Sequence, residues 1–180
     1  MKKQVLFLQG GGDDGYNADK EMVASLKKAL GKEYEVSYPE MPSDDTPDFG
    51  WGKQIGKEIS LLSDGAILVA HSLGASTLIK YLSENKISKK LAGIFLMSTP
   101  FWSGDEDWVQ GLKLQTGFEK NLPKNIPTFF YQCRDDEETL MEHFVVYREK
   151  LPWASFREIE SGGHQLDNDL GPVAKDIKDL

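Results

Sequence analysis

Short apolar runs alternate with helical patterns along the whole chain. Six runs, most of them rich in β-branched or aromatic side chains, predict strands at residues 5–8, 35–38, 67–70, 93–97, 128–131 and 156–159. Between them, apolar residues recur three and four positions apart, which is typical of helices that bury one face. This alternation of strand and helix predicts a parallel sheet covered by helices on both faces.

The helical patterns limit the topology. The first carries Met22, Leu26 and Leu30 on one face, begins after Asp19 as a predicted N-cap and ends at Gly31. Further apolar stripes span 55–62, 75–82, 140–147 and 170–177. Because crossovers between parallel strands are right-handed, few arrangements fit. We expect one α/β domain over residues 1–180, with three α/β/α layers around a doubly wound, mostly parallel six-stranded sheet of order 2-1-3-4-5-6.

Two connections are longer than the others. Residues 39–51 are rich in proline and aspartate, and residues 98–127 hold several aromatic side chains. Long loops inside a compact domain commonly serve a function. We predict that Phe101, Trp102 and Trp108, together with Trp51, wall a small apolar pocket for an acyl group, and the alternative is that these rings only cover the core.

A candidate nucleophile follows the third predicted strand. Residues 69–75 read Val-Ala-His-Ser-Leu-Gly-Ala and fit the pattern G-x-S-x-G, with Ala70 in place of the first glycine. The pattern needs small residues on both sides because strand and helix approach closely while Ser72 sits in a strained turn. At the helix start, the N–H of Leu73 is aimed at negative charge on a substrate oxygen. The alternative interpretation is a small polar turn.

A nucleophilic serine needs a histidine base and an acid, which in such sheets follow at later strand ends in the order acid, histidine. Asp135 and Asp136 follow the fifth strand, and His164 follows the sixth after two glycines. Of the other histidines, His143 lies on a predicted helix as a surface residue and His71 is expected to point away from the serine. Adjacent side chains in an extended segment diverge, so only one of the two aspartates meets His164. We favour Asp136, which reaches further past the sheet edge.

The first strand ends in a glycine-rich loop. Consecutive glycines let the backbone approach a ligand because no Cβ intervenes. We expect the N–H of Gly11, with Gly10 as a further candidate, to form an oxyanion hole with the N–H of Leu73. In the expected strand order the first and third strands are neighbours, so this loop and Ser72 lie at the same crevice.

The same loop has a rival interpretation. Gly10, Gly12 and Gly15 spell G-x-G-x-x-G between a strand and a helix, the pattern of a dinucleotide site. Against it, Asp13 and Asp14 would face a pyrophosphate of the same sign.

Charge and composition restrict the partners. With 21 Lys and Arg, 29 Asp and Glu and a net charge of −8, the chain offers no basic tract for nucleic acid. No stretch approaches the ~18 apolar residues of a membrane span. The single cysteine cannot form an internal disulfide, and residues 5–8 are too short for a secretory signal. We expect a cytoplasmic protein that binds neither membrane nor nucleic acid, needs no metal or cofactor, and carries Glu137 and Glu138 at a helix start.

Five segments carry a family resemblance: residues 7–12, 39–42, 70–75, 134–136 and 162–164. They are similar to the small single-domain serine hydrolases of the α/β-hydrolase superfamily, a group that includes retinoblastoma-binding protein nine and its bacterial relatives. The resemblance implies a compact α/β-hydrolase without a separate cap domain and a triad of Ser72, Asp136 and His164. Ala70 departs from the usual glycine. No Leu-x-Cys-x-Glu stretch occurs, so pocket-protein binding is not implied.

These features together predict a serine hydrolase that cleaves a small acyl ester through an acyl-enzyme. Amides and thioesters remain open as substrates, and the oligomeric state leaves no signature in the sequence. The alternative function is a non-catalytic binding or regulatory module that keeps the hydrolase scaffold.

Overall fold

The computed structural model describes residues 2–12 and 14–180, so Asp13 lies outside the described residues. Its centre is one sheet of six parallel strands in the order β2-β1-β3-β4-β5-β6. The strands are β1 Lys3–Leu8, β2 Tyr34–Ser37, β3 Ala66–His71, β4 Leu91–Met97, β5 Thr128–Cys133 and β6 Ser155–Ile159. The predicted strands and their order are confirmed, with bounds that differ by one or two residues.

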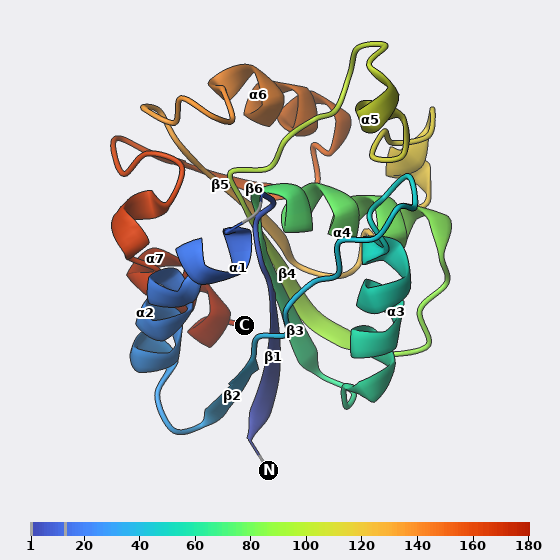
Figure 1. The fold of residues 1–180 in the computed structure, drawn as a ribbon. Coiled ribbons are helices and arrows are strands. Elements are labelled where there is room, and N and C mark those ends of the chain that lie inside the picture. The colour runs from blue at the N-terminus through green and yellow to red at the C-terminus, as the bar shows by residue number, and fades with distance from the viewer. Residues whose placement is uncertain (1, 13) are drawn as a thin grey trace.

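Helices cover both faces of this sheet (Figure 1). Helices α2 Lys20–Leu30 and α7 Gly171–Lys178 pack on one face, and α3 Trp51–Leu61, α4 Ser72–Glu84 and α6 Met141–Lys150 pack on the other. The remaining elements are short: α1 Gly15–Ala18, α5 Asp107–Gln110, and the 3-10 turns η1 Phe118–Lys120 and η2 Leu166–Asn168.

The two faces of the sheet have separate cores, because side chains alternate along each strand. In β1, Val5 and Phe7 join the core under α2 and α7, whereas Leu6 and Leu8 join the core under α3, α4 and α6. All six residues of β3 are buried, which fits a central strand covered on both sides. Burying one such aliphatic side chain contributes roughly 1.5–3 kcal/mol, so the strand end that carries the candidate nucleophile is held firmly.

Two local expectations are corrected. Asp19 occupies the position before α2, but its side chain makes no capping hydrogen bond, because it turns toward the carboxyl end of the sheet. Helix α6 begins at Met141, so Glu137 and Glu138 precede it in the connection after β5. Within the part of the chain that the structure describes, we find no helix long and apolar enough to cross a membrane.

Candidate active site

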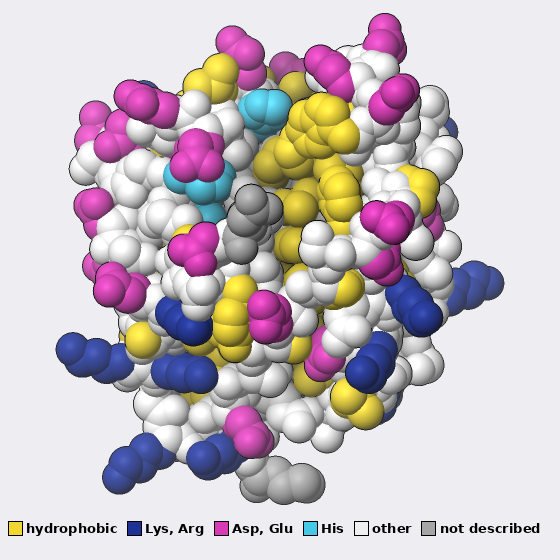
Figure 2. All heavy atoms as spheres, in the orientation of Figure 1, with side chains coloured by type: hydrophobic (Ala, Val, Ile, Leu, Met, Phe, Trp, Pro, Cys, Tyr) yellow, Lys and Arg dark blue, Asp and Glu magenta, His cyan; other side chains and the backbone are white. Residues whose placement is uncertain are grey.

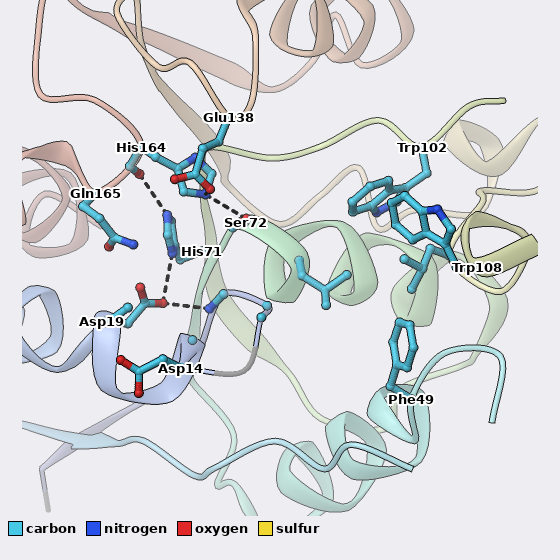
Figure 3. A pocket seen from close by; sticks show the side chains of 17 residues that line it. Asp14, Asp19, Phe49, His71, Ser72, Trp102, Trp108, Glu138, His164 and Gln165 are labelled. Carbon is cyan, nitrogen blue, oxygen red and sulfur yellow. Dashed lines mark hydrogen bonds and ion pairs between the residues drawn. The ribbon is translucent and has the colours of Figure 1, made fainter. Parts of the chain in front are cut away.

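Ser72 stands at the junction of β3 and α4. Its φ of 50° lies in the left-handed region, which costs a non-glycine residue about 1–3 kcal/mol. The tight turn depends on close packing beside it: a Cβ added at Gly74 would lie 2.3 Å from the Gln9 carbonyl oxygen. Ala70, in the place of the usual first glycine, is fully buried and supplies the other small side chain. The turn therefore lifts the Ser72 hydroxyl into the cleft at the carboxyl end of the sheet (Figure 3).

His164 links this hydroxyl to a carboxylate. Its Nε2 lies 2.9 Å from Ser72 Oγ, and its Nδ1 lies 3.0 Å from Asp136 Oδ2 and 3.1 Å from Asp136 Oδ1. The preceding glycines, Gly162 and Gly163, take φ values of 142° and 59°. Such values suit glycine, and they turn the loop after β6 back over the sheet edge. The structure thus brings together three side chains from three separate strand ends.

The two neighbouring aspartates hold different parts of the histidine loop. Asp136 Oδ1 accepts hydrogen bonds of 2.9 Å from the N–H groups of both Glu138 and Thr139, which leaves the carboxylate facing the imidazole. The Asp135 carboxylate instead accepts from the N–H groups of Gly162 and Gly163, at 3.2 and 2.9 Å. One aspartate therefore contacts the ring, and the other anchors the backbone that carries it.

The electrostatics favour a charged form of the pair. Burial works against ionisation of Asp136, but the hydrogen bond from His164 and the amide donors outweigh it and lower the pKa of Asp136 to about 2. Burial likewise works against the imidazolium of His164, and the hydrogen bond and charge of Asp136, followed by Glu138, raise the His164 pKa above its ordinary value. A positive charge on His164 is therefore stabilised.

The glycine-rich loop lies against the start of α4. A Cβ on Gly11 would come within 2.7 Å of Leu73 Cδ2, so a larger residue here would require the Leu73 side chain to move. The Leu73 N–H is in the first turn of α4, where amides have no partner four residues back. Gly10 corrects our expectation, because its N–H donates to Asp19 Oδ2 at 2.7 Å and is not available to an oxyanion.

A cleft of about 550 Å³ opens over Ser72 and His164. Its apolar wall includes Phe49, Trp102 and Trp108, and Figure 2 shows hydrophobic side chains gathered around a hollow on this face. Three carboxylates also line it, from Asp14, Asp19 and Glu138, whereas no lysine or arginine does among the residues that the structure describes.

Of the four residues predicted to wall an acyl pocket, two line this cleft. Trp102 and Trp108 line the cleft and pack edge to face, with ring centroids 5.3 Å apart. Phe101 lies outside it, because its ring packs against Tyr147 in the core. Trp51 is buried at the start of α3, donates its Nε1 to the Pro42 carbonyl and lines a neighbouring hollow instead.

Asp19, His71 and Glu138 belong to the site but were not predicted as such, and neither was Phe49 in the cleft wall. His71 lies between Asp19 and the loop of His164, and Glu138 Oε2 lies 3.7 Å from His164 Nε2. Local sequence patterns predicted other roles for three of them: a helix cap for Asp19, a helix start for Glu138 and a turn residue for His71. Asp19 and His71 are 52 residues apart, and no local pattern pairs them.

Sequence comparison assigns the chain to a family. The profile of the family described as serine hydrolase matches residues 15–171. The chain belongs to the serine hydrolase family. This match supports an enzyme, as predicted, over the alternative of a non-catalytic module. No curated protein sequence gives a significant match.

Solved structures share the fold of this serine hydrolase over nearly its full length. The ydeN gene product from B. subtilis is 17% identical, with 99% of this chain and 98% of that chain covered and a TM-score of 0.70. Arabidopsis thaliana SOBER1 is 16% identical, with 99% of each chain covered and a TM-score of 0.74. The thioesterase domain from the curacin biosynthetic pathway is 16% identical, with 98% and 91% covered and a TM-score of 0.74. These identities establish the fold alone, which is the predicted α/β-hydrolase fold.

Proposed function

We propose that this serine hydrolase is a carboxylic ester hydrolase that works through a triad of Ser72, His164 and Asp136. The observation that carries the proposal is the position of the His164 ring, whose two nitrogens contact Ser72 Oγ at 2.9 Å and Asp136 Oδ2 at 3.0 Å. A base that reaches the nucleophile and is oriented by a carboxylate is the arrangement that acyl transfer requires.

The first half of the reaction forms an acyl-enzyme. Ser72 Oγ attacks the ester carbonyl carbon while His164 Nε2 accepts the hydroxyl proton. Asp136 stabilises the resulting imidazolium and stays ionised, in keeping with its low pKa. The N–H groups of Gly11 and Leu73 bind the oxyanion of the tetrahedral intermediate, and each such donor contributes roughly 3–4 kcal/mol in enzymes of this type. The intermediate then breaks its bond to the alcohol oxygen, which takes the proton from His164.

The second half returns the enzyme to its starting state. Water attacks the acyl carbonyl as His164 Nε2 removes one of its protons, and the new tetrahedral intermediate expels Ser72 Oγ, which regains its proton from His164. The acid product leaves through the cleft. The same residues serve both halves, with the alcohol replaced by water.

The cleft supports a small uncharged acyl ester as substrate. Trp102, Trp108 and Phe49 give it an apolar wall, while its carboxylates disfavour an anionic substrate. The described part of the chain places no cap domain over the opening, so the substrate enters from solvent. We further propose that the protein is cytoplasmic and that this reaction needs no cofactor.

Covalent labelling tests the proposal directly. A fluorophosphonate probe should label the wild-type protein at Ser72, and Ser72→Ala and His164→Ala should abolish labelling. Ser60→Ala, which removes an exposed serine on α3, is the matched control and should label normally. A panel of nitrophenyl esters, thioesters and anilides of increasing acyl length then ranks the substrates. Normal labelling of Ser72→Ala would refute the triad.

A further inference from the structure

A second histidine–aspartate pair lies next to His164, below it in Figure 3. His71 Nδ1 is 2.9 Å from Asp19 Oδ2, and His71 Nε2 is 2.9 Å from the main-chain carbonyl oxygen of His164. Both side chains are only 1% exposed. Both side chains line the cleft, but their polar contacts go to each other, to Gly10 and to the His164 backbone and not to Ser72, so they take no part in the proposed chemistry as described above.

The pair connects two halves of the active site. Asp19 Oδ2 also accepts the N–H of Gly10, so it fixes the glycine loop that holds Gly11. At the other end, the His164 carbonyl belongs to the residue that carries the base. Asp19, between α1 and α2, and His71, at the end of β3, therefore join the expected oxyanion loop to the histidine loop after β6.

Counting donors determines the charge of the pair. The His164 carbonyl can only accept a hydrogen bond, so His71 Nε2 must carry a proton. Asp19 Oδ2 already accepts from the Gly10 N–H, and its 2.9 Å contact with His71 Nδ1 needs one proton between these two atoms. An imidazole nitrogen is a stronger base than a carboxylate oxygen, so this proton belongs to Nδ1. A neutral imidazole has only one N–H. Both contacts together therefore require an imidazolium at His71.

Two further observations agree with this count. Among the described residues Asp19 Oδ1 has no hydrogen-bond partner, and a buried carboxylate in that state needs a cation beside it. Ser98 Oγ lies 3.0 Å from the same His164 carbonyl, but it also lies beside Asp136 and has a single proton to donate. When Ser98 donates its proton to Asp136, His71 is the donor that remains on the His164 carbonyl.

We propose that Asp19 and His71 form a charged positioning pair that holds the catalytic histidine by its backbone. The inference rests on the proposed function, because its purpose is to keep His164 Nε2 on Ser72 Oγ. When His71 loses a proton, it can donate to Asp19 or to the His164 carbonyl but not to both. The histidine loop is then no longer tied to the glycine loop.

The surroundings of His71 bear on any pH dependence. The His164 ring is its nearest titratable neighbour apart from Asp19, with ring centroids 4.8 Å apart. The other charged groups that face this region come from the cleft wall and from the far side of His164: Asp14, Glu138 and Asp136. These three side chains are carboxylates, whereas the neighbouring His164 ring is itself a base.

Two substitutions at His71 distinguish the loss of its hydrogen bond to the His164 carbonyl from the mere loss of the imidazole ring. His71→Gln keeps an amide N–H at the reach of Nε2 and can still bind the carbonyl, whereas His71→Asn reaches only as far as Nδ1. We expect His71→Asn to lower kcat roughly 100-fold, the loss that a small misplacement of a catalytic group causes, with KM little changed. His71→Gln should recover much of this loss. Equal kcat values for both variants and the wild type would overturn the proposal.

The pair should also behave as one unit. Asp19→Asn keeps an acceptor for Gly10 but removes the negative charge, so it should lower kcat about as much as His71→Asn, and the double variant should be no worse. His143→Asn is the matched control on a histidine that binds only the backbone of Phe101, and it should leave kcat and its pH profile unchanged.

The charge of His71 can be measured without any substrate. Long-range proton–nitrogen NMR of wild-type protein with ¹⁵N-labelled histidine resolves three rings, assigned with the His71 and His143 variants. We expect protons on both ring nitrogens of His71 at a pH where His164 is neutral. A neutral His71 at that pH would overturn the proposal even if every variant misfolded. Failure of fluorophosphonate labelling would instead refute the proposed function and leave this measurement intact.

Discussion

His164 is the residue on which the proposed chemistry depends, since it must be neutral to accept the serine proton and charged in the transition state. Burial opposes its charged form, and Asp136 outweighs that effect through its hydrogen bond and charge. Because the folded pKa is raised, the base is protonated and inactive over a wider acidic range. Activity should therefore appear only as the pH rises through this pKa and should be lost as the pH falls through it.

Removing a nearby carboxylate should move this acidic limb. Glu138 Oε2 lies 3.7 Å from His164 Nε2, and its charge raises the His164 pKa. We expect Glu138→Gln to shift the acidic limb of the kcat/KM profile to lower pH. Glu149→Gln removes the same charge from an exposed position on α6 and serves as the control. A limb that stays in place, or moves to higher pH, would contradict this assignment of charges.

The two adjacent aspartates give a sharp comparison. Asp136→Asn should lower kcat by roughly 10⁴, the loss seen when the triad aspartate of a serine protease becomes asparagine, because the amide no longer holds the correct tautomer of His164. Asp135→Asn should cost much less, since its oxygen can still accept from the Gly162 or Gly163 amide. Ester hydrolysis by the two purified variants measures this difference, and similar losses would contradict the distinct roles.

Among the elements, the junction of β3 and α4 concentrates strain and close packing in a few residues. Ser72 takes a left-handed conformation, and α4 starts immediately against the end of β1. This arrangement is stable because β3 is buried on both faces and because small residues stand on either side of the serine. The strained backbone at this junction therefore presents the nucleophile to solvent at the start of a helix.

Adding a methyl group at Gly74 tests whether the Ser72 turn depends on a small residue at this position. Its Cβ would lie 2.3 Å from the Gln9 carbonyl oxygen and 3.0 Å from that of Leu8, both backbone atoms that cannot move alone. We expect Gly74→Ala to destabilise the fold by roughly 1–3 kcal/mol and to lower kcat as Ser72 shifts. Thermal unfolding and ester hydrolysis measure the two effects. Gly171→Ala, at the start of α7, meets only the flexible Asp169 side chain and should retain the wild-type Tm.

At the scale of the whole molecule, the charge of −8 and the acidic cleft act in the same direction. Carboxylates from Asp14, Asp19 and Glu138 line the site, and the potential they create extends beyond direct contact. His71 offsets part of that charge if it is an imidazolium. The remaining negative potential should select against anionic substrates before any contact with Ser72 is made.

A matched pair of esters measures this selection. Two phenyl butyrates that differ only in a ring sulfonate or a neutral sulfonamide have similar shapes but different charges. The sulfonamide ester should show the higher kcat/KM at low salt, and the ratio should fall toward one as salt shortens the Debye length from ~30 Å at 0.01 M to ~8 Å at physiological ionic strength. Equal values at low salt would show that the cleft potential does not reach the substrate.

The sequence by itself determined the sheet, its strand order and the residues at its carboxyl end. These follow from local information: the period of apolar positions, the small residues around Ser72 and the chain order of serine, aspartate and histidine. Burial repeats at every second residue in a strand and every third or fourth in a helix. Such a pattern therefore reports an element and its buried face without knowledge of any partner.

Only the tertiary structure decided which groups touch. In the folded protein Asp135 and Asp136 bind different groups, and the Gly10 N–H is taken up by Asp19. The Phe101 ring packs in the core, and Asp19 pairs with His71. Each of these outcomes depends on loop conformations and on contacts between residues from distant parts of the chain. Hydrogen bonds form between atoms within about 3 Å of each other. A sequence pattern locates a residue on an element, but only the folded loops set such distances.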